Sequence, residues 1–115
     1  MGSSFKNLLV WQKAHEFVME VYKVTKDFPK DELYGLTSQF RRAAVSIPAN
    51  IAEGYIRKGE KDKLRFCNIS QGFLEEYRYY IILANDLSYI QNYEIDKLLE
   101  EISKMLVAYM SKIKF

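Results

Sequence analysis

The residues best suited to chemistry in this sequence are basic side chains gathered near its middle. Five of them fall within nine positions, against only two acids, Glu60 and Asp62. The five are Arg57, Lys58, Lys61, Lys63 and Arg65. Tyr55 offers a stacking ring at the same end, and we expect Arg41 and Arg42 to lie near it on the preceding helix. Basic side chains beside an aromatic ring are suited to a phosphate backbone, so these residues predict contact with RNA or DNA.

The same basic segment has two other interpretations. Most charge runs are simply the solvated start of a helix. The segment could also be buried at an interface between subunits. The formal net charge of +2 does not by itself imply a nucleic-acid partner. If phosphates are bound, little sequence preference is expected, because backbone contacts carry no sequence information.

The acidic pair Glu75 and Glu76 is the next candidate. Adjacent helical residues point about 100° apart, so the two carboxylates are poorly placed to share a proton as a catalytic dyad would. We expect them to form an ion pair across helices with Arg41 or Arg42, and Glu53 could join that network.

The remaining reactive residues do not form a catalytic or metal-binding set. His15 is the single histidine and Cys67 the single cysteine. A zinc site needs several such ligands, and a cysteine nucleophile needs an activating base. The sequence also lacks a glycine-rich phosphate loop and a serine elbow. We therefore expect no catalytic residues, no metal, no cofactor and no enzymatic activity.

The elements that would position these residues are helices. A chain of 115 residues is expected to form one domain. A first helix, about residues 9–26, is predicted by apolar positions spaced three and four apart. Those positions are Trp11, Ala14, Val18, Val21, Thr25 and Phe28.

A second helix is predicted over about residues 31–53. It starts either at a cap on Asp31 or after Gly35, with a restart at Thr37. Pro48 should kink it near Ala44, and the Ser46 hydroxyl could satisfy a backbone group that the proline frees. Gly54 is expected to end it in a left-handed conformation.

A third helix is predicted over about residues 60–87 and a fourth over about 93–112, with Asn92 as the cap of the fourth. The third helix shows an apolar stripe of Phe66, Ile69, Phe73, Tyr77, Tyr80, Ala84 and Leu87. From Tyr77 onward it is apolar nearly all round, so a second subunit could cover it. The fourth shows a stripe of Ile95, Leu98, Ile102, Met105, Leu106, Tyr109 and Ile113.

Together these elements predict an all-α fold, an up-down-up-down antiparallel four-helix bundle with a Pro-kinked second helix. No stretch alternates with the period of a strand. No apolar run approaches the roughly 20 residues that span a membrane. A lone cysteine suits a reducing compartment, so a cytoplasmic location without a membrane partner is expected.

Several segments resemble the bacterial four-helix-bundle family of 23S rRNA-intervening sequence proteins. The most specific lies in the middle of the chain, from Gln39-Phe40-Arg41-Arg42 through Ser46-Ile47-Pro48 to Glu53-Gly54. Others are Phe5 to Leu9 with Val10-Trp11-Gln12-Lys13-Ala14, then Phe28-Pro29, Tyr34-Gly35-Leu36, Arg65-Phe66 and Leu74-Glu75. Phe73 and Ile56 depart from the family, which often has a small residue and a glycine at these positions.

The resemblance implies a four-helix bundle that assembles into a ring-like homopentamer, and it transfers no catalytic residues. Family members are encoded within insertions in rRNA genes or elsewhere in bacterial genomes, and nucleic-acid binding is suspected for them. A more distant resemblance is to the accessory protein of diversity-generating retroelements, which partners a reverse transcriptase. Two hypotheses follow: a homo-oligomer that binds RNA or DNA, and an adaptor whose partner is a protein such as a polymerase.

Overall fold

The computed structural model describes residues 4–90 and 93–113, and within these ranges all regular secondary structure is helical. Four α-helices follow one another: α1 Leu9–Thr25, α2 Leu36–Tyr55, α3 Glu60–Asp86 and α4 Tyr93–Ser111. Two 3-10 turns, η1 Phe5–Asn7 and η2 Lys30–Glu32, precede α1 and α2. The prediction of an all-α, four-helix fold is confirmed.

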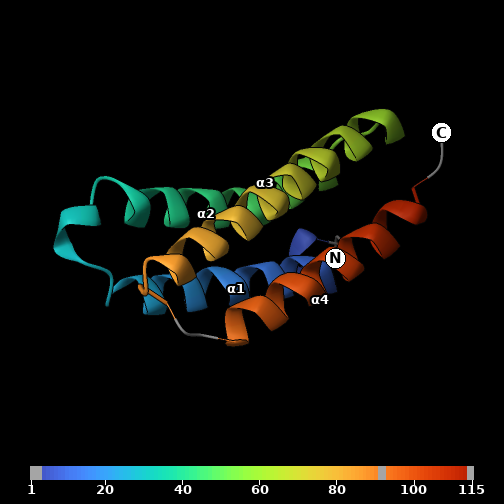
Figure 1. The fold of residues 1–115 in the computed structure, drawn as a ribbon. Helices are drawn as coiled ribbons and strands as arrows, with labels where there is room; N and C mark the ends of the chain where they lie inside the picture. Colours follow the sequence, from blue (N-terminus) through green and yellow to red (C-terminus); the bar gives the residue numbers. More distant parts are fainter. Residues whose placement is uncertain (1–3, 91–92, 114–115) are drawn as a thin grey trace.

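The helices lie side by side along an elongated molecule of 45 × 25 × 22 Å, and each reverses the direction of the one before it (Figure 1). Among the helix pairs in contact, the packing is most extensive between α2 and α3 and least extensive between α3 and α4. Helix α1 packs on both α2 and α4. The α2–α3 hairpin therefore forms one unit, and α1 joins it to α4.

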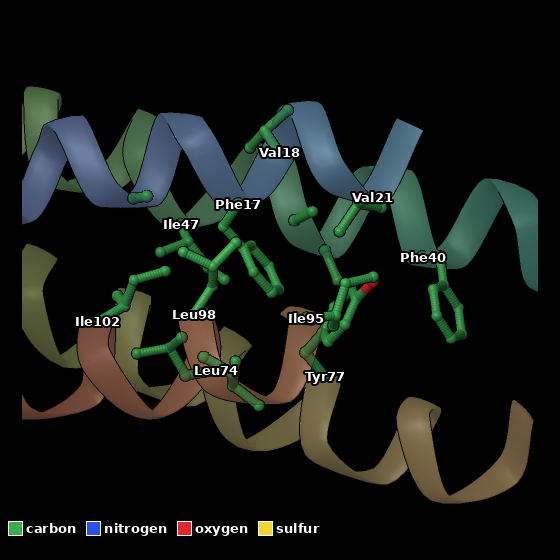
Figure 2. Packing of buried hydrophobic residues seen from close by; sticks show 14 of the residues in the cluster. Phe17, Val18, Val21, Phe40, Ile47, Leu74, Tyr77, Ile95, Leu98 and Ile102 are labelled. Carbon is green, nitrogen blue, oxygen red and sulfur yellow. The ribbon is translucent and has the colours of Figure 1, made fainter. Parts of the chain in front are cut away.

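All four helices send apolar side chains into one core (Figure 2). At its centre the Tyr77 ring of α3 meets Phe17 of α1 and Phe40 of α2 edge to face, with ring centroids 4.8 and 5.0 Å apart. Such edge-to-face pairs add to the stabilisation that burial of the rings already gives. This aromatic cluster fixes the three helices against one another.

Helix α2 starts at Leu36, after the 3-10 turn that contains Asp31. The start at residue 31 was therefore wrong, and the alternative of a restart after Gly35 was close. Glu32, not Asp31, contacts the start of this helix: its carboxylate accepts a hydrogen bond from the Leu36 backbone N–H at 3.2 Å. This contact satisfies one of the N–H groups that a helix start leaves unpaired.

Helix α2 continues through Pro48 to Tyr55. The Ser46 hydroxyl donates to the carbonyl of Arg42 at 2.9 Å, one turn back on its own helix. It does not serve Ala44, whose carbonyl loses its donor to the proline. A kink at Pro48 stays a prediction.

Gly54 does not end α2 in a left-handed conformation, so that prediction was wrong: Gly54 lies inside the helix, and no described glycine has a positive φ. Its role is to allow close packing. A Cβ atom on Gly54 would lie 2.9 Å from the Cβ of Phe66 on α3. The glycine lets the two helices approach just before the chain turns from one to the other.

The buried stripe of α3 differs from the predicted one. It consists of Cys67, Ser70, Leu74, Tyr77, Ile81 and Ala84. Phe66, Ile69, Phe73 and Tyr80 flank it and are only partly buried. On the outer side Tyr79 and Ile82 remain 59% and 58% exposed in the single chain.

Helix α4 buries Ile95, Leu98, Leu99, Ile102 and Leu106. Its predicted cap, Asn92, lies outside the described residues. Among the helices that the structure describes, none is both long and apolar enough to pass through a membrane.

Candidate nucleic-acid interface

The basic segment forms one end of the molecule, where α2 turns into α3 (Figure 1). We call residues 55–65 the α2–α3 tip. Ile56 follows the end of α2 and is 67% exposed, while Gly59 precedes α3 in an extended conformation. Glu60 and Asp62 occupy the first turn of α3, where acids favour the helix dipole.

Two arginines of the tip contact the Phe66 ring. The guanidinium carbons of Arg57 and Arg65 lie 4.8 and 4.6 Å from the ring centroid. Each of these two arginines also forms an ion pair with an acidic side chain three or four residues before it. Arg57 pairs with Glu53, and Arg65 Nε lies 3.5 Å from Asp62 Oδ1. Both guanidinium charges are therefore partly neutralised within the chain.

One of the three lysines of the tip contacts other groups of the chain, and the other two form no ion pair among the described residues. Lys63 Nζ donates to the Tyr55 carbonyl at 2.6 Å and lies 5.4 Å from the centroid of the Tyr55 ring. The ring that was expected to stack on a base is thus already in contact with a cation. Lys58 and Lys61 are exposed, and no carboxylate of the described chain lies within 4.0 Å of either.

Arg41 and Arg42 do not join this tip. They lie near the start of α2, about 20 Å from Tyr55 along a helix that rises 1.5 Å per residue. The expectation that they lie near the basic segment was wrong, because the twenty-residue helix separates its two ends. The Arg41 guanidinium instead covers the Tyr22 ring of α1 at 4.8 Å, and its Nε donates to Thr25 Oγ1 at 2.9 Å.

The expected pairing of Glu75 and Glu76 with these arginines was also wrong. Glu75 pairs with Arg78 on its own helix, at 3.0 Å between Oε1 and Nε. Glu76 accepts a hydrogen bond from the Tyr80 hydroxyl, which raises the pKa of Tyr80 to about 12. Arg41 is turned toward α1, so it cannot reach these acids on α3.

The single histidine and the single cysteine lie in surroundings that are common for these residue types. The His15 ring is exposed and stacks on Trp11, with centroids 5.3 Å apart. Cys67 is buried in the core, and this burial raises the pKa of its thiol, against a smaller lowering by Lys63. No group of three metal-ligating side chains is found in residues 4–90 and 93–113.

A second surface was not predicted from the sequence. A hollow of about 570 Å³ lies between α1, the segment Leu33–Tyr34 that follows η2, and the first half of α2. We call it the Arg41–Arg42 hollow, because both arginines line it together with Tyr22, Tyr34 and Ser38. Tyr34 is 94% exposed. The available signal was an aromatic residue in the polar break seven positions before Arg41.

These features define an all-α four-helix-bundle protein with a basic tip and an arginine-lined hollow at opposite ends of α2. The chain belongs to the family of 23S rRNA-intervening sequence proteins, whose sequence model matches residues 6–108. The resemblance identified from the central motif is thereby confirmed.

A solved structure supports the fold. The chain is similar to a crystal structure of a protein of unknown function from the S23 ribosomal protein family of Bacteroides thetaiotaomicron, with a TM-score of 0.80 and 23% sequence identity. The similarity covers 90% of this chain and 96% of that one. A search of curated proteins found no match.

Proposed function

We propose that this protein is a non-enzymatic, cytoplasmic homo-oligomer that binds the backbone phosphates of RNA or DNA at the α2–α3 tip. The observation that carries the proposal is the pair of exposed lysines, Lys58 and Lys61, without carboxylate partners in the described chain. Ammonium groups in this state can pair with nucleic-acid phosphates without first breaking an ion pair, and the cations condensed on the nucleic acid are then released. Arg57 and Arg65 add charge beside them, although each is shared with an acid.

One tip carries a modest charge, because Glu53, Glu60 and Asp62 oppose its five basic residues. Assembly would strengthen it, since the fields of several tips on one oligomer add. The exposed apolar pair Tyr79 and Ile82 on α3 supports such an assembly. The family's name, which refers to sequences that interrupt 23S rRNA, favours RNA as the partner.

The experiment is a salt series of binding to a structured RNA and to a duplex DNA of equal length. Two lysine–phosphate contacts give a slope of about −1.8 in log affinity against log salt on duplex DNA, and several tips on one duplex give a steeper slope. The double variant Lys58→Gln, Lys61→Gln should flatten the slope. The matched control, Lys23→Gln with Lys26→Gln, removes the same charge from the exposed end of α1 and should not.

Absence of binding at low salt, or an equal slope in both double variants, would contradict the proposal. A tip variant that dissociates the oligomer instead would place the basic segment at the subunit interface.

The second candidate function is a protein-interaction adaptor. Tyr79 and Ile82 favour it as well, because exposed apolar side chains on an outer helix face are typical of interaction surfaces. Neutralising the tip lysines separates the two functions: binding of a protein partner should survive, and binding of nucleic acid should not.

A further inference from the structure

The five arginines of the chain fall into two groups. Arg57, Arg65 and Arg78 each have a carboxylate partner. Arg41 and Arg42 have none within 4.0 Å among residues 4–90 and 93–113. These two are also the arginines that share a hollow. Two unpaired guanidinium groups in one concave surface point to an anionic ligand.

The Arg41 side chain is held in place before any ligand arrives. Its Nε donates to Thr25 Oγ1, and Thr25 is only 3% exposed. The same threonine hydroxyl donates to the Val21 carbonyl at 2.8 Å, which fixes its own orientation. Since the guanidinium also lies on the Tyr22 ring, both terminal nitrogens remain for a ligand at a reduced cost in side-chain entropy.

The other walls of the hollow are suited to a planar ring. Tyr34 is almost fully exposed at its rim, whereas the Tyr22 ring already carries the Arg41 guanidinium. Aromatic side chains of this kind stack on unpaired bases. Among the described residues no carboxylate lines the hollow, and its volume of about 570 Å³ lies within the range of small-ligand sites.

We propose that the Arg41–Arg42 hollow binds a nucleoside 5′-phosphate, with the phosphate on the two guanidinium groups and the base against Tyr34. The ligand can be a free mononucleotide or one unpaired nucleotide of a single strand, because both present the same groups. A duplex is disfavoured, since its bases are stacked and cannot enter. The hollow lies about 20 Å from the α2–α3 tip along α2 and does not depend on binding there.

The first measurement is calorimetric titration with adenosine 5′-monophosphate. Inorganic phosphate and adenosine, the two parts of this mononucleotide, are titrated separately for comparison. A short oligoadenylate is titrated as the single-stranded ligand. The mononucleotide should bind more tightly than either part. Tighter binding of the oligoadenylate would identify a strand as the source of the ligand, and tighter binding of the mononucleotide a free nucleotide.

The variants Arg42→Gln and Arg41→Gln locate the site. Each should weaken mononucleotide binding by about 10-fold or more, the effect of losing a charge-assisted hydrogen bond. Arg42 is exposed, so Arg42→Gln stays informative if Arg41→Gln disturbs the contact with Thr25. Tyr34→Ala removes a ring without a buried contact and should weaken binding of the mononucleotide but not of phosphate.

Arg65→Gln is the control, because it removes an equal charge at the tip, and it should leave mononucleotide binding unchanged. The double variant Lys58→Gln, Lys61→Gln should do the same, so failure of the tip proposal and failure of this one are distinguishable. The proposal is overturned if the mononucleotide does not bind, or if Arg42→Gln binds it as the unaltered protein does. It is also overturned if phosphate alone, or a glutamate-rich peptide, binds as tightly.

Discussion

Gly54 shows how one missing side chain sets the distance between two helices. A methyl group there would lie 2.9 Å from Phe66 Cβ and 3.4 Å from the Lys63 carbonyl oxygen. Neither atom is the end of a flexible side chain, so the helices themselves would have to separate. We expect Gly54→Ala to lower the free energy of unfolding by about 1–3 kcal/mol, the usual cost of overpacking. Urea unfolding at fixed protein concentration measures it.

Gly72 is the matched control, because it lies in α3 and a methyl group added to it would meet no atom within 4 Å. Gly72→Ala should raise stability by about 0.5–1 kcal/mol, since alanine is the better helix former. If both alanine variants are stabilised, close approach is not the reason for glycine at position 54.

The Tyr80 hydroxyl provides a prediction of pH dependence. Its hydrogen bond to Glu76 is the main cause that raises its pKa from 10.0 to about 12, while the charge of Arg42 opposes the rise. Because the folded-state pKa is the higher one, the hydrogen bond stabilises the fold fully below pH 10. This contribution is lost as the pH rises from about 10 to about 12.

Tyrosinate absorbance can follow this ionisation. The difference between the titrations of the unaltered protein and of Tyr80→Phe isolates one tyrosine. In a Glu76→Gln background that difference curve should move to lower pH, and in an Arg42→Gln background to higher pH. Unchanged curves in both backgrounds would show that neither charge acts on Tyr80.

The candidate site could be predicted from the sequence only in part. The clustering of basic residues in the α2–α3 tip follows from their positions along the chain. Which charges remain free does not, because this depends on side-chain partners. The sequence places Arg57 four residues after Glu53, a spacing at which helical side chains pair. The contact of Arg41 with Thr25 joins two helices and leaves no local signal.

At the scale of elements, the four helices could be predicted because apolar residues recur with helical spacing. The face that α3 buries could not, because large apolar residues also lie on its flank and the small residues Cys67 and Ser70 lie in its core. Ser70 is fully buried, and its hydroxyl donates to the Ile47 carbonyl of α2 at 2.9 Å. In a sequence, a serine indicates an exposed position. Here the hydrogen bond of Ser70 removes most of the free-energy cost of burying its hydroxyl.

Arg78 strengthens the least extensive helix contact, that of α3 with α4. It bridges Glu75 on its own helix to Glu100 on α4, and its Nη2 donates to Ser103 Oγ at 2.9 Å. The side chain is 32% exposed, so solvent screens the pair only in part. We expect Arg78→Gln to lower the free energy of unfolding by about 1 kcal/mol, at the upper end for exposed ion pairs. Amide hydrogen exchange should quicken mainly in α4.

The control is Arg65→Gln, whose pair with Asp62 stays within α3 and is 60% exposed at the arginine. It should change stability by less than about 0.5 kcal/mol and leave exchange in α4 unaltered. Equal effects of the two variants would mean that Arg78 does not tie α4 to α3.

At the scale of the whole molecule, the single chain leaves an apolar surface on the outer side of α3. The bundle covers one side of this helix with α2 and α4, and Tyr79 and Ile82 point away from both. Burying such residues against a second copy would remove their apolar area from water, at about 25 cal/mol per Å². The same surface repeated on each copy can close into a symmetric assembly.

The proposed assembly can therefore be tested without disturbing the core. Light scattering after gel filtration should give a multiple of the 13.6 kDa chain mass for the unaltered protein, five times that mass if the family resemblance holds. Tyr79→Glu with Ile82→Glu should reduce the mass toward one chain, because the introduced carboxylates would lose their hydration in the interface. Met19→Glu on α1, at a side chain that is 60% exposed, is the control for surface charge alone and should keep the assembly. A single-chain mass for the unaltered protein would remove the multiplication of charge on which strong binding at the α2–α3 tip relies, and the adaptor function would then be favoured.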